Sequence, residues 1–234
     1  MNEFIYDGLP SSTFEAYIAS SNFLDGASRD VSPVEIPGRN GNLNLDNRRF
    51  NNFVLVENLY IRKDILQNAN ALRQFLAAHS TTYYPIEEDF TPEIFRMARY
   101  SGAFTVETFD HVGGAFSIEF DCKPQRFLKS GTVTEEITSG TSITNPTAFQ
   151  AQPLIRIYGN GVLTIGTQTV TVANNTYAYV DVDSEIMDCF YGTTNLNSKV
   201  TLSGHEFPVL EPGSNAITYT DITKVEITPR WWIL

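Results

Sequence analysis

Three acidic residues in the C-terminal half of the chain are spaced by two positions: Asp181, Asp183 and Glu185. Residues two apart on a strand point to the same face, so this spacing would gather the carboxylates on one side of a hairpin. Such a group could bind a calcium ion or, as a carboxyl pair, cleave a glycosidic bond. Tyrosines and valines surround these acids, which is typical of a sheet with one wet face. We therefore expect a solvated sheet face, with calcium or sugar contact as the alternative.

Other combinations of residues that carry catalysis are missing from the sequence. The acidic run Glu87–Asp89 is expected to be a solvated loop, because adjacent side chains point apart. No GxSxG motif occurs, and nucleophile–histidine sets can be assembled only by arbitrary choice among scattered residues. Gly159, Gly161 and Gly166 lack the spacing of a phosphate-binding loop and precede no predicted helix. The sequence therefore predicts no catalytic residue and no enzymatic activity.

The histidines and cysteines do not form a metal-binding pattern. His79, His111 and His205 lie far apart, and Cys122 and Cys189 do not have CxxC spacing. We expect both cysteines to be reduced, since free cysteines are among the most frequently buried residues. Neither a metal nor a cofactor is predicted.

Residues 29–52 stand out as a polar stretch rich in arginine and asparagine. The segment has too few apolar side chains to fill a core. Gly38 and Gly41 are expected to take backbone angles that are closed to other residues. Long excursions of this kind are usually functional or disordered. We expect a turn-rich excursion over or beyond the domain surface that contacts another protein.

The composition limits the class of protein. The chain has 234 residues, of which 42% are apolar and 18% charged, as in ordinary globular proteins. The net charge of −11 argues against a protein that grips nucleic acid, although it would let DNA pass without binding. No apolar run of about 18 residues indicates a membrane span, and the first residues do not resemble a signal peptide. We expect synthesis in the cytosol and no contact with a membrane.

The N-terminal part, residues 1–130, predicts an α+β domain with a mostly antiparallel sheet and one packed helix. Apolar residues at helical spacing predict the helix over residues 65–79, with Asp64 as N-cap and Gln67 completing a capping box. Alternation predicts the strands, at residues 4–6, 14–18, 53–62, 81–85, 94–100, 102–109 and 115–122. Turn signals are predicted at Asp7-Gly8-Leu9-Pro10 and at Gly113-Gly114.

The remaining chain predicts a connector and a second domain. Residues 131–152 are rich in Thr, Ser and Gly and are interpreted as a connector, either a linker or a strand pair that bridges two domains, with an edge strand near Glu135. Residues 153–234 show short strands without a helix, including a hairpin turn at Asn160-Gly161, which predicts a β-sandwich. Trp231 and Trp232 would face opposite sides of a strand, one in the core and the other at an interface, with a sugar platform as the alternative.

Several strings, taken together and in order, resemble the distal tail protein (Dit) family of siphophages, the phages with long non-contractile tails. The resemblance spans nearly the whole chain. The strings are RDVSPVEIPGRNG with the following DNRRFNN, NANALRQFLAAHSTTYYPI, FRMARYSG, FSIEFDCKPQRF, NPTAFQAQPLIRIYGNGVLTI and FPVLEPGSNAITYTDITKVEITPRWWIL.

The resemblance implies a virion structural protein of the phage tail tip or baseplate. Its N-terminal domain would form a homohexameric ring around the DNA channel, as one ring or two stacked rings, and its C-terminal domain would be a galectin-like β-sandwich. The implied partners are the tail tube protein, the tail-tip hub protein and, as a further option, a receptor-binding protein. DNA would pass through the lumen without specific binding.

Ring closure requires contacts between different surfaces of neighbouring copies, which arginine forks and hydrogen-bonding loops suit. We therefore expect subunit contacts at Arg39, Asn40, Asn42, Arg48 and Arg49. The alternative function is a carbohydrate-binding module of a phage adhesion device that uses the C-terminal sandwich, because fold alone does not decide activity.

Overall fold

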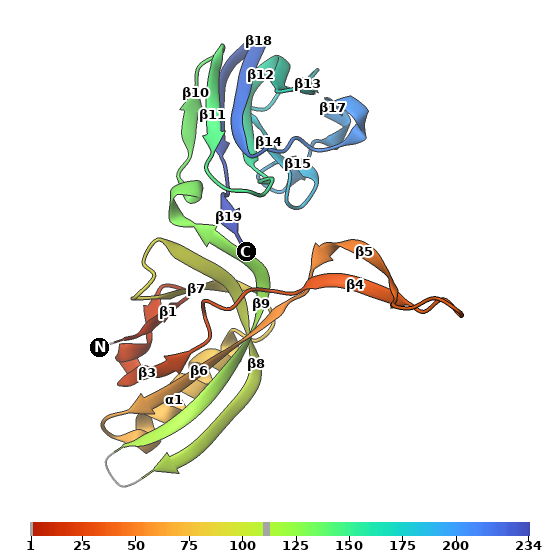
Figure 1. Ribbon diagram of the computed structural model, residues 1–234. Coiled ribbons are helices and arrows are strands. Elements are labelled where there is room, and N and C mark those ends of the chain that lie inside the picture. The colour runs from red at the N-terminus through yellow and green to blue at the C-terminus, as the bar shows by residue number, and fades with distance from the viewer. Residues whose placement is uncertain (1, 110–112) are drawn as a thin grey trace. The chain divides into compact units, whose positions relative to one another are not determined.

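The computed structural model describes residues 2–109 and 113–234, and the chain forms two compact units (Figure 1). Unit 1 comprises Met1–Arg126 together with Leu234, and unit 2 comprises Phe127–Ile233. The described residues are mainly in strands, with one α-helix, so the mainly β class expected from the sequence is confirmed.

Unit 1 is built on one curved sheet. Its strand order is β2 (Leu9–Pro10), β1 (Phe4–Tyr6), β7 (Tyr84–Glu88), β8 (Ile94–Phe109), β9 (Gly114–Leu128), β6 (Phe53–Ile61) and β3 (Ala16–Ser21). The N–H of Ile18 in β3 donates to the carbonyl oxygen of Asn2, just before β1. The two ends of the sheet therefore approach each other around a shared apolar core.

The hairpin between β1 and β2 follows directly from its turn residues. Tyr6 pairs with Leu9, so only Asp7 and Gly8 lie in the loop, and both have positive φ, at 48° and 76°. Two positive φ values define the type I′ turn whose twist matches that of the flanking strands. The predicted turn is confirmed at Asp7 and Gly8, whereas Leu9 and Pro10, which were also expected in the turn, form β2.

The helix α1 (Ile65–Ala78) covers the core of unit 1. Its predicted apolar stripe is confirmed, since Leu72 and Leu76 are fully buried. The predicted capping box is wrong. Asp64 has left-handed backbone angles and its side chain makes no capping hydrogen bond, because a capping side chain needs an extended backbone at that residue.

The other strands of unit 1 differ from the predictions in their bounds. The strand expected at 81–85 begins at Tyr84, and the 3-10 helix η1 (Ser11–Phe14) delays the start of β3 to Ala16. The two strands expected at 94–109 form the single strand β8, in which Gly102 adopts φ 104°. The β8–β9 turn expected at Gly113 includes residues 110–112, which lie outside the described part of the chain.

Residues 29–50 form a separate two-stranded sheet, here called the arm (Figure 1). Strand β4 (Arg29–Val34) pairs antiparallel with β5 (Leu43–Phe50). Gly38 and Gly41 in the connecting loop have φ of 81° and 79°, which confirms the expected left-handed angles. The excursion predicted as turn-rich is thus a β-hairpin, because its alternating residues pair across the two strands.

Unit 2 encloses a second apolar core in a β-sandwich. The sheet order is β10-β18-β12-β14-β15-β16, with β11 beside β18 and β13 between β12 and β17. The strands of this sheet are β10 (Glu135–Ile137), β11 (Thr141–Asn145), β12 (Leu154–Ile165), β13 (Gln168–Val172), β14 (Val180–Asp183), β15 (Asp188–Tyr191), β16 (Thr194–Asn195), β17 (Val200–Leu202) and β18 (Gly213–Thr228). The short strand β19 (Trp232–Ile233) does not belong to it. The 3-10 helices are η2 (Lys129–Thr132), η3 (Asn197–Lys199) and η4 (Ser203–His205).

Two features of unit 2 correct the sequence interpretation. Residues 131–152 are not a connector, because β10 and β11 both pair with β18 and belong to this unit. No hairpin turn occurs at Asn160-Gly161, since β12 continues through these residues with a shift in register. A Cβ atom on Gly161 would lie 2.2 Å from the carbonyl oxygen of Thr220, so this glycine permits close strand pairing and makes no turn.

Within residues 2–109 and 113–234, α1 is the only α-helix, and no helix combines the length and apolar character that crossing a membrane would require.

Candidate assembly surface

The arm has two faces that the strand register defines. Val34 pairs with Leu43 and Ser32 with Leu45, so these four side chains share one face. Pro33 pairs with Asn44 on the opposite face. Because each face carries both apolar and polar side chains, neither face is a typical core surface.

Ion pairs within the arm hold its two strands together. The Arg29 guanidinium donates from Nε to Asp46 Oδ1 at 2.9 Å and from Nη2 to Asp46 Oδ2 at 2.6 Å. On the other face, Arg49 Nε donates to Asp30 Oδ2 at 2.6 Å. The hydrogen bond from Arg29 lowers the pKa of the Asp46 carboxyl, and hydrogen bonds from Asn47 and Arg49 lower that of Asp30. The arm is therefore ordered by its own cross-strand contacts.

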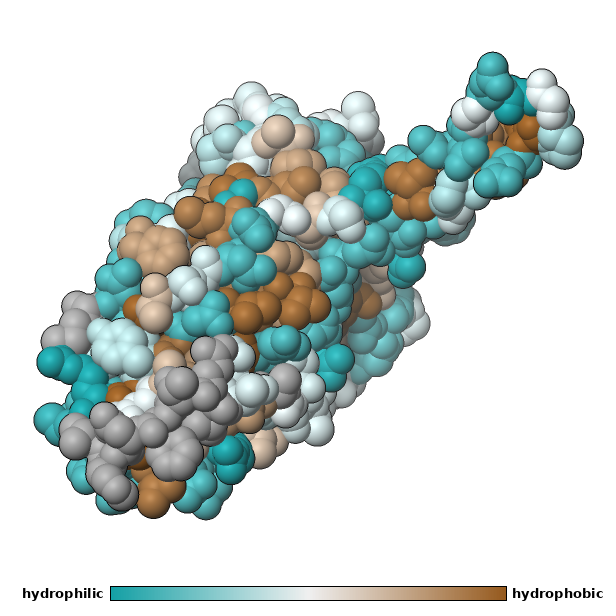
Figure 2. Space-filling view, turned by 60° about the horizontal axis from the view of Figure 1, so that its bottom comes forward, coloured by the Kyte–Doolittle hydropathy of each residue, from teal (hydrophilic) through white to brown (hydrophobic). Residues whose placement is uncertain are grey.

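Apolar side chains of the arm are nevertheless exposed. Those exposed by more than a third of their surface are Val31, Val34, Ile36, Leu43 and Leu45. In Figure 2 these hydrophobic residues interrupt the hydrophilic surface of the arm. Val34, Leu43 and Leu45 share one face of the hairpin, and exposed apolar side chains that lie together often mark a contact with a partner. The arm thus has the composition of one half of an interface.

The structure separates the five residues predicted to contact another subunit into two groups. Arg39, Asn40 and Asn42 lie in the loop at the tip of the arm, and Arg48 and Arg49 lie in β5; all are exposed. Arg49 is engaged with Asp30 inside the arm. Among the described residues, the side chains of Arg39 and Arg48 form no hydrogen bond or ion pair, so they are available to a partner.

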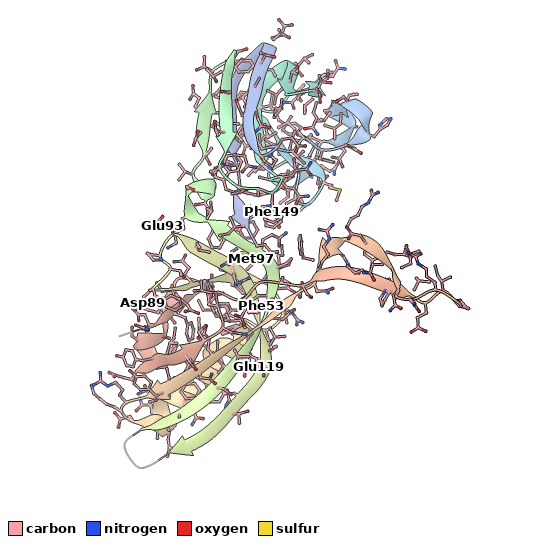
Figure 3. The ribbon with its side chains drawn as sticks, viewed as in Figure 1. Phe53, Asp89, Glu93, Met97, Glu119 and Phe149 are labelled. Atoms are coloured by element: carbon pink, nitrogen blue, oxygen red, sulfur yellow. The ribbon has the colours of Figure 1, made fainter. Side chains whose placement is uncertain are left out.

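The root of the arm consists of residues 21–28, which lead into β4, and residues 51–52, which follow β5. A buried arginine holds the first of these two segments. Arg96 in β8 is fully buried and donates to the carbonyl oxygen of Phe23 from Nε at 3.1 Å and from Nη2 at 2.8 Å. Its Nη2 also donates to the carbonyl oxygen of Asp25 at 2.5 Å. The guanidinium lies 4.7 Å from the ring centre of Phe53, labelled in Figure 3. The backbone entering β4 is therefore fixed from inside unit 1.

The other side of the root is held at the end of β5. Asn52 Nδ2 donates to the Tyr83 hydroxyl at 2.8 Å and to Asp121 Oδ1 at 2.9 Å. Although partial burial acts to raise it, hydrogen bonds from Tyr83, Asn52 and Arg99 keep the pKa of Asp121 below its ordinary value. Asn51 N–H donates to the Ser28 carbonyl oxygen, which closes the base of the hairpin.

Beside this root lies a pair of buried acids. Glu88, expected in a solvated loop, is a residue of β7 with 1% exposure, and Glu57 in β6 has 0%. Burial raises the pKa of both carboxyls, and the charge of Glu88 raises that of Glu57 further. The prediction for Glu88 was wrong because the alternation of β7 places this residue inward.

The burial of Asp181 and Asp183 also differs from the prediction. Asp181 and Asp183 are buried, and each accepts two hydrogen bonds from an arginine, Asp181 from Arg156 and Asp183 from Arg230. The predicted wet face is therefore wrong for these two acids. Among the described residues, no group of three His, Cys, Asp or Glu side chains is placed to hold a metal ion.

The two tryptophans occupy different environments in unit 2. Trp231 is 5% exposed and belongs to the apolar core. Trp232 is partly exposed; its ring stacks on Phe149 at 4.4 Å between centres, and its Nε1 donates to the Gln150 carbonyl oxygen at 2.8 Å. One ring is thus buried and one face of the other is covered.

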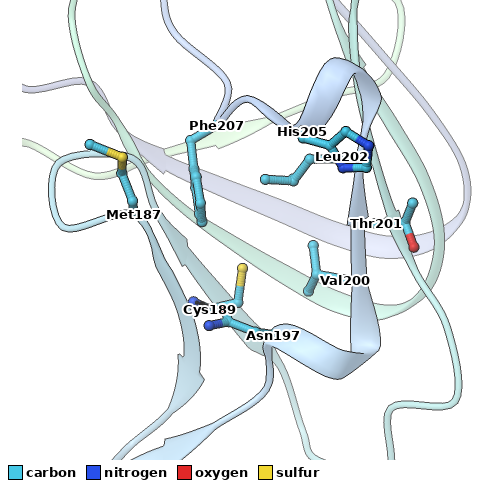
Figure 4. A pocket seen from close by; sticks show the side chains of 8 residues that line it. All are labelled: Met187, Cys189, Asn197, Val200, Thr201, Leu202, His205 and Phe207. Atoms are coloured by element: carbon cyan, nitrogen blue, oxygen red, sulfur yellow. Dashed lines mark hydrogen bonds between the residues drawn. The ribbon is translucent and has the colours of Figure 1, made fainter.

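A cavity of about 370 Å³ opens in unit 2 among residues that include Met187, Cys189, Asn197 and Phe207 (Figure 4). Burial raises the pKa of the Cys189 thiol to about 12, so it is protonated at neutral pH. The Asn197 side chain is already engaged, donating to Asp188 and accepting from the Cys189 N–H. The cavity therefore presents neither a thiolate nucleophile nor a free amide.

Sequence analysis assigned only polar residues of the arm to the predicted contact, so it left out the exposed apolar residues, and it missed the residues that hold the root of the arm. The exposed Val and Leu side chains could have been predicted as a contact surface, since they alternate within the polar stretch. No pattern in the sequence predicts the role of Arg96, because its partners lie more than 70 positions earlier in the chain.

No protein-family model and no curated protein sequence matches the chain. A solved structure similar to it is the crystal structure of the Dit protein (gp 19.1) of phage SPP1, described as a paradigm of the hub adsorption apparatus in phages that infect Gram-positive bacteria. The TM-score is 0.72 with 16% identity, and the match covers 100% of both chains. The chain has the fold of a phage Dit protein.

Two further solved structures are similar to the chain. Structures of the phage P2 baseplate in its activated conformation, one with Ca and one with Sr, match with TM-scores of 0.57 and 0.55. Their identities are 11% and 10%, and each match covers 97% of both chains. The resemblance to Dit read from the sequence is therefore confirmed at the level of the fold.

Proposed function

We propose that this protein is a structural component of a phage tail tip or baseplate. The observation that carries the proposal is the Dit fold over the full length of the chain, with a phage hub protein as its structural neighbour. The arm supports it, because an ordered hairpin with exposed apolar residues has the character of an assembly element. The chain acts by assembly, without a catalytic step.

Six copies of the chain form each ring around the DNA channel, and the assembly has one ring or two stacked rings. The ring joins the tail tube protein to the tail-tip hub protein and serves as a platform for the adsorption apparatus, including a receptor-binding protein. The net charge of −11 suits a lumen through which DNA passes without binding. The protein is made in the host cytoplasm and is located in the virion.

Each copy would place its arm on a different surface of its neighbour, since head-to-tail contacts close into a ring. Arg39 and Arg48 would donate to that neighbour, with Asn40 and Asn42 beside them. Leu43 and Leu45 would be covered by it. Arg49 would act mainly within the arm, where it pairs with Asp30.

Negative-stain images of the purified full-length protein, together with its mass by light scattering, test this function. The expected result is six-fold rings with a mass of six or twelve copies. A monomer across all concentrations, with no ring in the presence of a tail-tip extract, would contradict the proposal.

Saccharide binding by unit 2 through Trp231 and Trp232 has less support. Trp231 is buried in the core, and Phe149 covers one face of Trp232. A saccharide platform needs open aromatic faces, so we do not adopt this alternative.

A further inference from the structure

Two buried carboxyl groups meet at one hydroxyl group in unit 1. Ser21 Oγ, at the end of β3, lies 3.1 Å from Glu57 Oε1 and 2.6 Å from Glu88 Oε1. β7 is separated from β6 by two strands and from β3 by three in the sheet order, so the curvature of the sheet brings the two acids together. The assembly function proposed above uses neither acid.

The hydrogen bonds at Ser21 can be counted. A serine hydroxyl has one hydrogen and two acceptor lone pairs. The Phe23 N–H donates to Ser21 Oγ at 3.0 Å, which occupies one lone pair. The single hydroxyl hydrogen can be donated to only one of the two carboxylates. The other contact becomes a hydrogen bond only if that carboxyl carries a proton and donates it to Ser21 Oγ.

The surrounding charges favour one proton on the pair. Arg96, from β8, is the nearby cation that acts on Glu88, and Cys122, from β9, is neutral because burial raises the pKa of its thiol to about 12. One shared proton leaves the pair with one negative charge, which the guanidinium of Arg96 compensates. Two ionised carboxylates would carry more negative charge than the single positive charge of Arg96. The remaining charged groups that act on this cluster are Asp25, Asp89, Asp121 and Arg126.

We propose that Glu57 and Glu88 hold one shared proton at neutral pH and that this proton fixes the root of the arm. Ser21 is followed by Asn22 and Phe23, and the Phe23 carbonyl oxygen is the acceptor for Arg96. Loss of the proton would leave two negatively charged carboxylates, and the Ser21 hydroxyl has a hydrogen for only one of them. Ser21 would then turn away, and the Phe23 N–H would lose its acceptor.

The first test is the pH dependence of unfolding of the full chain in urea. Unfolded glutamates have a pKa of about 4.3, so the unfolded chain has released the proton that the folded chain retains. The stabilisation is complete below that pKa and is lost as the pH rises through the folded-state value. One retained proton raises the unfolding constant of unit 1 by about tenfold for each pH unit in this window.

Glu88→Gln reduces this dependence, because it removes the charge that raises the pKa of Glu57, while its amide group can still donate to Ser21 Oγ. Between about pH 5 and pH 7, the unfolding constant of the variant should rise less steeply than that of the wild type, by up to about tenfold per pH unit. Glu57→Gln should behave alike. Glu93→Gln, at an exposed residue labelled in Figure 3, is the matched control and should keep the wild-type slope. Wild-type slopes in both buried-site variants would overturn the proposal.

A second measurement covers the case in which the variants do not fold. Carbon-13 NMR of the side-chain carboxyls in the wild type should show one proton retained by the Glu57–Glu88 pair at about pH 7, well above the usual range for glutamate. Full ionisation of both carboxyls at about pH 6 would overturn the shared proton.

The hydrogen exchange rate of the Phe23 amide, measured in wild type and in Glu88→Gln, tests whether the proton fixes the root of the arm. Comparing the two proteins at the same pH cancels the intrinsic effect of pH on exchange. The ratio of the wild-type rate to the variant rate should rise as the pH increases. A constant ratio, with the difference in unfolding slope present, would overturn the role of the proton at the root.

Discussion

The guanidinium of Arg96 and the carbonyl oxygen of Phe23, 73 positions apart in the chain, form a buried pair of hydrogen bonds. Through this contact a residue in the centre of the unit 1 sheet fixes the backbone that leads into the arm. An exposed hairpin needs such an anchor, because its own two strands are only marginally stable in water.

Arg96→Lys is expected to destabilise unit 1 by about 2–4 kcal/mol, because an ammonium group cannot reproduce the fork of hydrogen bonds and is more costly to bury. Urea unfolding followed by circular dichroism at the helix band reports unit 1, which contains α1. Arg99→Lys is the matched control; its side chain is 42% exposed in the ion pair with Asp121, so its loss of stability should be much smaller than that of Arg96→Lys. Equal losses for the two variants would refute the anchoring role of Arg96.

The double variant Leu43→Ser, Leu45→Ser should prevent ring formation and leave the fold intact. Both side chains are exposed in the isolated chain, so the free energy of unfolding should change by less than about 0.5 kcal/mol. Light scattering over a dilution series measures assembly. Leu66→Ser, on the exposed face of α1 at 74% exposure, provides a control that should assemble normally. Assembly of the double variant at wild-type concentrations would exclude the arm from the interface.

Replacing Arg39 and Arg48 by Ala should weaken assembly more than replacing Arg49, since Arg49 is already paired with Asp30. We expect the double variant to need at least about tenfold higher protein concentration, which corresponds to about 1.4 kcal/mol. The loss should shrink as salt is added, because salt already screens the contacts of the wild type. A larger effect for Arg49→Ala would mean that arm stability, not partner contact, controls assembly.

Asp183→Asn should destabilise unit 2 at neutral pH by about 3–5 kcal/mol, because it breaks a buried ion pair and leaves Arg230 without its carboxylate. Burial alone would raise the pKa of Asp183, but the hydrogen bonds from Arg230 hold it below its ordinary value. The pair therefore contributes its stability above the unfolded pKa of about 3.9, and this contribution is lost as the pH falls through the lower folded value.

Tryptophan fluorescence measures this effect selectively, since both tryptophans of the chain lie in unit 2. The difference in stability between wild type and Asp183→Asn should narrow on going from about pH 7 to about pH 2. Glu185→Gln, at the more distant partner of Arg230 at 3.5 Å, should have a much smaller effect. A difference that does not depend on pH would show that the aspartate acts through packing and not through its charge.

The sequence was sufficient where local periodicity or turn chemistry decides the structure. The apolar stripe around Leu72 predicted α1, and the Asp7-Gly8 pair predicted a tight turn that the structure contains. The polar stretch with Gly38 and Gly41 was recognised as an excursion outside the core. The order of the quoted strings also led to the Dit fold, which the SPP1 structure confirms.

Burial of the charged residues was decided by the tertiary structure. Arg156 meets Asp181 and Arg230 meets Asp183 across separations of 25 and 47 positions, which local alternation cannot reveal. Glu88 was misread because the predicted strand ended at residue 85, whereas β7 continues to Glu88, and the curvature of the sheet then brings Glu88 to Glu57. An acid is buried where a distant partner or a shared proton compensates its desolvation, and those partners are chosen by the strand order and curvature that only the folded chain has.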